Sequence, residues 1–346
     1  MRQIKPPYYL SFFTVLVLGL GFWVLEAEPI LPSVNEKLKG VCWVGSRQPL
    51  QGGELAALRD IGANAISQTP FGWQADKNKP EIRWSLDAER QWWGESARGI
   101  RATADSSINL GISNMLKPHL WARGSWPGEI EMNSEEDWVL WFENYKNFIV
   151  DYAKLAAELD FPILCIGTEL EKTVHRRKEW LEIISSIREV YGGKLIYAAN
   201  FTEFEHVTFW DELDYIGIQA YFPISEGQEP DLNQLKKGWK NPLASIEKLV
   251  RNYQLPVIFT EIGYCNTADA AAEPWVWPNE RKESPLSEEV QARCYQAFFE
   301  TAWKKPWLAG VYFWKWYPEG KRRDPDFSPQ GLKAQEVLEV HFSSVD

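Results

Sequence analysis

The sequence predicts an α/β fold, a single (β/α)8 barrel preceded by an N-terminal hydrophobic segment that exports or anchors the chain. Three observations lead to this prediction. Short apolar runs alternate with helical patterns from residue 39 onward. Most of these runs hold consecutive apolar residues, as parallel strands do when both of their faces are buried. The 346-residue length also leaves room for eight strand–helix units after the N-terminal segment.

The N-terminus carries the pattern of an export segment. Arg2 and Lys5 precede an almost unbroken apolar run from Tyr8 to Leu25, and positive residues before such a run are typical of exported chains. The run has the minimum length for a membrane span and lacks a clear cleavage site. Residues 1–25 are therefore either a signal peptide or an uncleaved anchor that holds the chain at the membrane through residues 8–25. Either reading places the remainder outside the cytoplasm, periplasmic, extracellular or membrane-anchored.

A linker rich in proline and charge is predicted at 26–38, and the barrel domain at 39–346. The eight strands are expected to begin near Gly40, Asn64, Gly111, Pro162, Lys194, Leu213, Pro256 and Ala309. Apolar residues at helical spacing, with a capping box from Ser134, predict the helices between them. These helices lie at 53–61, 134–159, 177–190, 242–253, 287–304 and 330–340. The segment between the fifth and sixth strands is short and has the weakest helical pattern.

A doubly wound sheet is the alternative architecture. It usually brings a glycine-rich nucleotide loop after the first strand, whereas this chain has Gly-Ser-Arg-Gln-Pro there, at 45–49, without that spacing. The barrel is therefore favoured.

Charge and cysteine usage exclude several classes of function. The 37 basic and 48 acidic residues give a net charge of −11, and without a basic stripe nucleic acid is not an expected partner. The four cysteines and four histidines contain neither a CxxC motif nor a ligand-spaced histidine pair. No metal or cofactor is therefore predicted, while a disulfide stays open. We expect a monomer.

Two carboxylates stand where a barrel of this kind places its reacting groups, at the carboxyl ends of the strands. Glu169 follows the apolar run of the fourth strand, and Glu261 ends the seventh. Each is an unusual residue for a strand end, and a structural ion pair is the alternative explanation for either one. Two such residues at one barrel mouth favour glycoside hydrolysis, which needs one protonated and one ionised carboxyl group.

The aromatic content fits a carbohydrate ligand. The chain has 19 tryptophans, far more than ordinary globular composition. Most must pack in the core, but aromatic faces also stack on sugar rings. Seven fall at strand ends or in the loops that follow them: Trp73, Trp84, Trp92, Trp93, Trp121, Trp126 and Trp314. A polysaccharide or oligosaccharide is therefore the expected partner.

Three motifs in order carry a family likeness: Leu-Lys-Pro-His at 116–119, Ile-Gly-Thr-Glu-Leu at 166–170 and Phe-Thr-Glu-Ile-Gly-Tyr at 259–264. They resemble glycoside hydrolase family 113, the endo-β-1,4-mannanases, within a clan of retaining (β/α)8 TIM-barrel glycosidases. The resemblance covers roughly residues 38–340. Many clan members have Asn before the acid/base, where this chain has Thr168, a variation that the family tolerates.

The resemblance implies that Glu169 is the general acid/base and Glu261 the nucleophile of a double displacement, with their carboxyl groups ~5–5.5 Å apart. It also implies that Tyr221 hydrogen-bonds the nucleophile and that Trp314 forms the floor under the reacting sugar. The candidates for contacts with sugar hydroxyls, or for support of the acid/base, are His119, Lys117 and Asn200. The candidate sugar platforms are Trp73 and Trp121.

Two alternatives to a β-1,4-mannanase stay open. The same chemistry could act on another β-glycan, such as glucan or xylan, because the choice of sugar depends on a few hydroxyl contacts. A non-catalytic carbohydrate-binding protein could also use a glycosidase scaffold, although the presence of both glutamates and Tyr221 argues against it.

Overall fold

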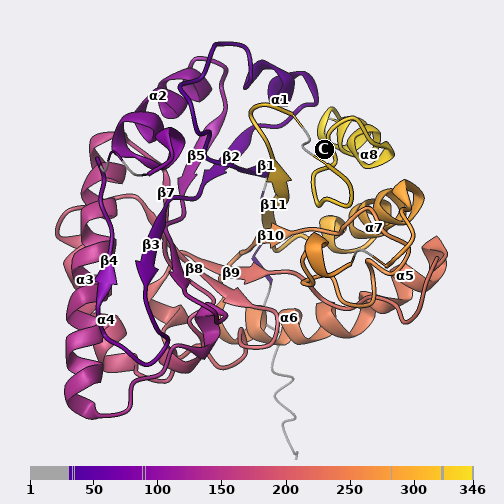
Figure 1. Cartoon of the computed structure of the whole chain (residues 1–346). Coiled ribbons are helices and arrows are strands. Elements are labelled where there is room, and N and C mark those ends of the chain that lie inside the picture. The colour runs from indigo at the N-terminus through magenta and orange to yellow at the C-terminus, as the bar shows by residue number, and fades with distance from the viewer. Residues whose placement is uncertain are drawn as a thin grey trace, which may run out of the picture. The chain divides into compact units, whose positions relative to one another are not determined.

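The computed structural model describes residues 31–344 except 33, 35, 88, 90, 282, 321 and 322. Its centre is a closed barrel in the order β1-β11-β10-β9-β8-β7-β5-β2, seen end on in Figure 1. All pairings within the barrel are parallel. The strands are β1 (Leu38–Trp43), β2 (Ala65–Gln68), β5 (Ser113–Leu116), β7 (Ile163–Thr168), β8 (Lys194–Asn200), β9 (Tyr215–Gln219), β10 (Val257–Ile262) and β11 (Leu308–Trp316). The eight predicted barrel strands are confirmed.

The predicted export or anchor segment, residues 1–25, lies outside the described residues. In the part of the chain that the structure describes, no helix is both long and apolar enough to cross a membrane. Leu38, the last residue of the predicted linker, is the first residue of β1.

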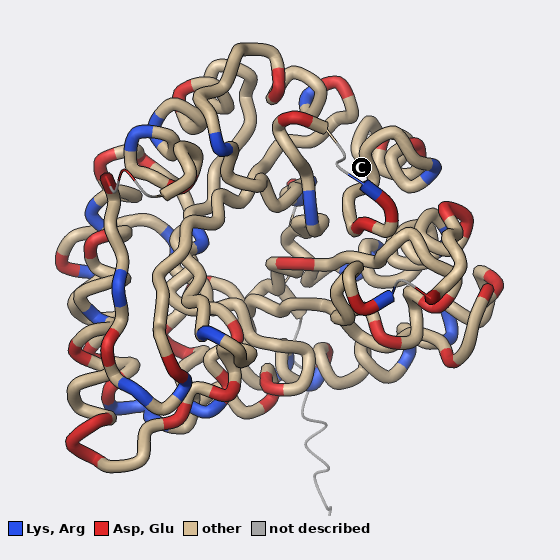
Figure 2. Tube along the Cα trace, in the orientation of Figure 1, with Lys and Arg blue, Asp and Glu red and all other residues tan. Residues whose placement is uncertain are grey.

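Helices surround the barrel (Figure 1). They are α1 (Ala56–Asp60), α2 (Ala97–Ile108), α3 (Glu135–Glu158), α4 (Arg177–Arg188), α5 (Leu232–Gly238), α6 (Lys240–Tyr253), α7 (Glu288–Glu300) and α8 (Lys333–Phe342). Each of the six predicted helices is present, while α2 and α5 were not predicted. Basic and acidic residues are interspersed over these outer helices and loops (Figure 2).

The wall between β8 and β9 departs from the regular barrel pattern. The connection contains turns and the short 3-10 helix η4 (Trp210–Glu212) where a full repeat would place an α-helix. Aromatic residues seal the wall instead: Phe209 packs against Tyr197 of β8 at a ring distance of 5.4 Å and stacks on Trp180 of α4 at 4.9 Å. The segment between β8 and β9, which has the weakest helical pattern in the sequence, therefore forms no α-helix.

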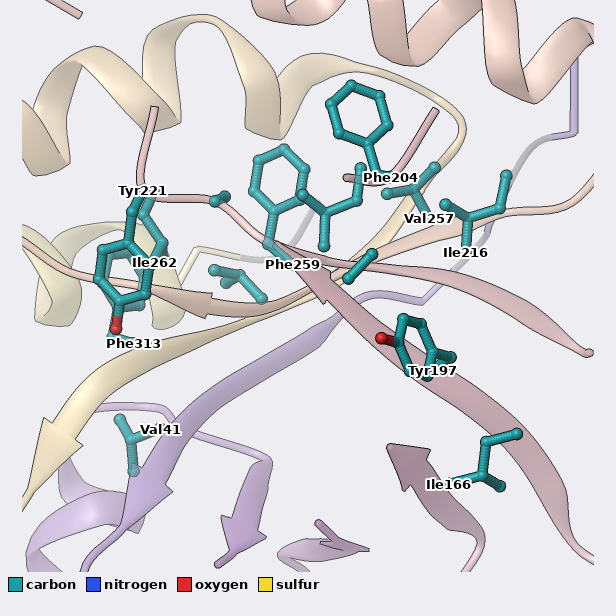
Figure 3. Packing of buried hydrophobic residues seen from close by; sticks show 14 of the residues in the cluster. Val41, Ile166, Tyr197, Phe204, Ile216, Tyr221, Val257, Phe259, Ile262 and Phe313 are labelled. Atoms are coloured by element: carbon teal, nitrogen blue, oxygen red, sulfur yellow. The ribbon is translucent and has the colours of Figure 1, made fainter. Parts of the chain in front are cut away.

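The alternation of side chains along the strands divides the core into two layers. One layer fills the barrel interior and is built mainly of small or flexible side chains, including Cys42, Ala65, Met115 and Cys165. The other lies between strands and helices, where Val257 and Phe259 point toward the surrounding helices (Figure 3). All four cysteines are free and buried.

A small second sheet forms part of the barrel mouth. Strands β2 and β5 are each interrupted by a proline, Pro70 and Pro118, and then continue as β3 (Phe71–Gln74) and β6 (His119–Ala122). Proline has no N–H to donate, which explains why the ladder breaks there. Beyond the break β3 and β6 pair in parallel, and β4 (Ile82–Arg83) completes the sheet.

Candidate active site

A pocket of about 660 Å³ opens at the carboxyl ends of the barrel strands and contains both predicted catalytic carboxylates. Glu169 directly follows β7, and Glu261 is the fifth residue of β10. Aromatic side chains dominate the remaining wall. The lining residues include Phe71, His119, Trp121, Trp126, Asn200, Phe201, Gln219, Tyr221, Trp275, Trp277, Trp314 and Phe327.

Glu261 lies deep in this pocket, with only 4% of its surface exposed. The buried ammonium of Lys117 donates a hydrogen bond to Oε1. The Tyr221 hydroxyl donates to Oε2 at 2.7 Å. Burial and the charge of Glu261 raise the pKa of Tyr221 well above its usual value, so the phenol keeps its proton and acts as the donor. Each carboxylate oxygen of Glu261 therefore accepts one hydrogen bond, and Lys117 also supplies a counter-charge.

Lys117 has a different place from the one that its motif predicted. It follows Met115 by two residues, so it continues the interior face of its strand and lies under the pocket rather than along its wall. Its side chain is completely buried. Burial acts to lower the pKa of Lys117, but the charge of Glu261, the hydrogen bond to it and the nearby thiols of Cys42 and Cys165 together outweigh burial, and the pKa is raised. The Lys117 ammonium is bound to Glu261, and the expectation that Lys117 contacts sugar hydroxyls or supports the acid/base stays a prediction.

Glu169 has neutral hydrogen-bond donors. Asn200 donates from Nδ2 to Oε1 at 2.6 Å, and the Trp126 indole donates to Oε2 at 2.8 Å. Burial, followed by the charge of Glu261, raises the pKa of Glu169 to about 6, although the two donors act in the opposite direction. A carboxyl group with such a pKa can carry a proton near neutral pH and release it again.

Local backbone geometry sets the direction of Glu169. Its φ of 53° lies in the left-handed region that side-chain-bearing residues seldom adopt. Just before it, Gly167 lies so close to Tyr197 that an added Cβ would be 2.8 Å from that ring. The Gly-Thr-Glu order therefore permits a sharp exit from β7 against the ring of the neighbouring strand.

His119 and Trp314 form the middle of the pocket. Their rings are stacked, with centroids 6.3 Å apart. Burial, and to a lesser extent the charge of Lys117, lower the pKa of His119 well below its usual value, so the imidazole is neutral. Its Nε2 lies 3.7 Å from Glu261 Oε1 and has no hydrogen-bond partner within the described chain. This nitrogen is buried beside the carboxylate of Glu261.

The predicted site residues divide into three groups. Glu169, Glu261, Trp314, Tyr221, His119, Asn200 and Trp121 line one pocket. Lys117 lies beneath it. Trp73 lies outside the lining set and is 47% exposed, but it pairs across the small mouth sheet with Trp121, with ring centroids 6.3 Å apart.

Aromatic residues of three loops were not selected as site residues from the sequence. Trp126, predicted only as a loop tryptophan, contacts Glu169 directly. Trp275 stacks on Phe201 at a centroid distance of 5.2 Å, and both line the pocket. The sequence Glu-Pro-Trp-Val-Trp-Pro at 273–278 carried a usable signal, because alternating tryptophans between prolines in a loop after a barrel strand seldom serve the core.

Among the described residues, no group of three or more His, Cys, Asp or Glu is arranged to hold a metal ion. The chemistry that this arrangement offers is that of two carboxyl groups in one aromatic pocket. One is held against a cation and a phenol, and the other is poised to exchange a proton.

Comparisons with known proteins identify a matching family and solved structures of similar fold. A family model described as Glycoside Hydrolase Family 113 matches residues 47–328. The structure of GH113 β-mannanase AaManA from Alicyclobacillus acidocaldarius in complex with ManMIm is 25% identical, with a TM-score of 0.78 over 89% of this chain and 97% of that chain. No curated protein matches.

Two further solved structures share the fold. A GH113 β-1,4-mannanase has 23% identity and a TM-score of 0.77 over 90% of this chain and 100% of its own. A family 5 mannosidase from Rhizomucor miehei has 13% identity and a TM-score of 0.58 over 89% of this chain and 92% of its own.

Proposed function

The chain belongs to glycoside hydrolase family 113, and on that premise we propose that this glycoside hydrolase cleaves β-1,4-mannan or its oligosaccharides by a retaining double displacement. The observation that carries the proposal is the contrast between two glutamates in one pocket. Lys117 and Tyr221 bind Glu261, whereas Glu169 has only neutral donors and a pKa raised to about 6.

Glu261 is the nucleophile in this proposal. Its carboxylate attacks the anomeric carbon as the bond from that carbon to the leaving oxygen breaks, and a covalent glycosyl-enzyme forms. Protonated Glu169 gives its proton to the leaving oxygen. Tyr221 and Lys117 keep Glu261 ionised and aimed before the attack.

Hydrolysis of the glycosyl-enzyme reverses these roles. Ionised Glu169 removes a proton from a water molecule. At the same time the water oxygen bonds to the anomeric carbon, and the bond from that carbon to Glu261 breaks, so that the carboxylate of Glu261 leaves. Two inversions give net retention. Trp314 and His119, whose stacked rings line the pocket, support the reacting sugar.

The choice of mannan rests on the relatives, since AaManA is described as a β-mannanase and the second GH113 structure as a β-1,4-mannanase. Trp121 and the Phe201–Trp275 pair offer further ring surfaces within the same pocket. Glucan and xylan present similar faces to such platforms, so substrate identity needs a direct test.

The test combines a substrate panel with product stereochemistry. Manno-, gluco- and xylo-oligosaccharides linked β-1,4 are incubated with the purified chain, and proton NMR follows the anomeric signal of the first product. We expect hydrolysis of the manno-oligosaccharides with the β-anomer appearing first. Initial release of the α-anomer contradicts the retaining mechanism, preferential cleavage of another series contradicts the mannan assignment, and saturable sugar binding without hydrolysis favours a binding protein.

We also propose that the barrel acts outside the cytoplasm, on the basis of the apolar N-terminal run after Arg2 and Lys5. Fractionation of cells that express the full chain tests this location. Recovery of all the protein in the cytosolic fraction contradicts it.

A further inference from the structure

Glu203 is a buried acid that the hydrolytic steps above do not use. Its side chain is inaccessible to solvent and lies outside the pocket lining. Oε1 accepts two hydrogen bonds, from the Tyr197 hydroxyl at 3.0 Å and from the backbone N–H of Asn200 at 3.1 Å. Oε2 has no hydrogen-bond partner within the described residues. A carboxyl group buried in this way needs a reason, since an apolar side chain would avoid the desolvation cost.

The contact with Tyr197 leads to one side of Glu169. The Tyr197 hydroxyl accepts a hydrogen bond from the backbone N–H of Leu170 at 2.8 Å while it donates to Glu203. Leu170 directly follows Glu169, whose left-handed φ of 53° requires support from its surroundings. Glu203 and Tyr197 together therefore hold the turn in which Glu169 stands.

The contact with Asn200 leads to the other side of Glu169. Glu203 holds the Asn200 backbone, and Thr202 donates to Asn200 Oδ1 from its N–H at 3.0 Å and from its hydroxyl at 2.8 Å. The Asn200 amide is thereby oriented with Nδ2 toward Glu169 Oε1, at 2.6 Å.

We propose that Glu203 is a positioning residue for the acid/base, which ties the turn after β7 to the end of β8 and so fixes both the backbone and the hydrogen-bond partner of Glu169. This inference rests on the proposed function, because it assigns Glu203 to the proton transfer of that reaction. Burial raises the pKa of Glu203 well above its usual value, and the nearby acids Glu169 and Glu171 act in the same direction. Burial therefore favours the uncharged form of Glu203.

The test separates help with protonation from general structural support. Three variants, Glu203→Gln, Glu203→Leu and Tyr197→Phe, are compared with wild type on two substrates. A manno-oligosaccharide releases a poor leaving group that needs a proton from Glu169, whereas a dinitrophenyl β-mannoside releases one that needs none. The ratio kcat/KM reports the first displacement for both.

We expect Glu203→Leu and Tyr197→Phe to lower kcat/KM about 10- to 100-fold on the oligosaccharide, and less than about threefold on the dinitrophenyl glycoside. Glu203→Gln keeps an acceptor oxygen at the Oε1 position and should stay within about threefold of wild type on both. The alkaline limb of its pH–rate profile should not move, because an uncharged group has been replaced by another.

Equal losses on both substrates, or wild-type kinetics in Glu203→Leu and Tyr197→Phe, would overturn the assignment. So would an alkaline limb that moves to lower pH in Glu203→Gln, which would reveal a charge at Glu203. If Glu203→Leu does not fold, Tyr197→Phe alone decides, because it removes the same link by deleting one oxygen. A wild-type chain inactive on both substrates would instead contradict the proposed function itself.

Discussion

The surroundings of Glu261 and of Glu169 differ in charge, although the two residues share one pocket. Around Glu261, a buried ammonium and a phenol donate to the two carboxylate oxygens. Around Glu169, an amide and an indole donate, and the charge with the largest effect on its pKa is the negative charge of Glu261. The same side chain is thus suited to nucleophilic attack at one position and to proton exchange at the other, and neighbours make that difference.

The largest effect should follow from removing the ionised member of the pair. Glu261→Gln leaves nothing to attack the anomeric carbon, so kcat should fall by about 10⁴-fold or more. Steady-state kinetics on manno-oligosaccharides measure this, and circular dichroism checks the fold. Glu143→Gln, at an exposed position on α3, is the matched control and should keep wild-type activity. Substantial activity in Glu261→Gln would remove the nucleophile from the proposal.

Removing the cation tests what Lys117 contributes to Glu261. Lys117→Met keeps the length of the side chain but leaves the buried carboxylate without its counter-charge, so activity at neutral pH should fall about 100-fold. Steady-state kinetics on manno-oligosaccharides measure this loss. Lys178→Met, whose lysine side chain is 86% exposed on α4, is the control and should keep wild-type activity. Wild-type activity in Lys117→Met would show that the hydrogen bond from Tyr221 is sufficient.

A smaller effect should distinguish the acid/base. Protonated Glu169 is the active form in the first displacement, so with a pKa of about 6 the value of kcat/KM should fall as pH rises through that region. Trp126 donates to the ionised form and lowers this pKa, so Trp126→Phe should raise it and move the alkaline limb to higher pH. Trp275 lines the same pocket but makes no hydrogen bond to Glu169, so Trp275→Phe is the control. If the alkaline limb of Trp126→Phe moved to lower pH instead, Trp126 would have to raise the pKa of Glu169 in the wild type, which contradicts the prediction.

The smallest effect is expected at the edge of the comparison, where neither glutamate is in reach. Trp73→Ala removes an exposed ring next to Trp121, and KM for long manno-oligosaccharides should rise about 2- to 10-fold. Short substrates and the melting temperature should be unaffected, because the ring is 47% exposed. A loss that is independent of chain length would assign Trp73 to the fold or to the reacting sugar.

The barrel could be predicted from the sequence because its eight strands are buried on both faces, and such strands appear in the sequence as continuous apolar runs. Sequence reasoning missed α2 because the buried face of that helix carries only one large apolar side chain, Ile100, beside the small or polar residues Ala97, Gly99, Thr103, Ala104 and Ser107. It missed α5, where Leu235 is the one buried residue within the helix, although the Asp231 and Gln234 capping box was readable.

The candidate site was predictable to the level of residues at strand ends, but not to the level of their contacts. The motif around Lys117 indicates a position near the mouth, while its role depends on which face of the strand it occupies. The break at Pro118 separates Lys117 inside the barrel from His119 on the mouth sheet. The role of Glu203 could not be predicted for a similar reason. It depends on contacts with Tyr197 and Asn200, and the sequence does not show that these two residues contact Glu169 and the turn that follows it.

The mouth sheet has a consequence for how the pocket tolerates changes in chain length. Phe71 faces His119 and Trp73 faces Trp121 in one parallel register, fixed by the two proline breaks. A strand has a side-chain period of two, so His119 and Trp121 share one face of the sheet. One residue inserted after Pro118 would turn both side chains to the opposite face, whereas two inserted residues would return them to the original face. Loss of activity after a single insertion and its partial recovery after a double one would reveal this parity.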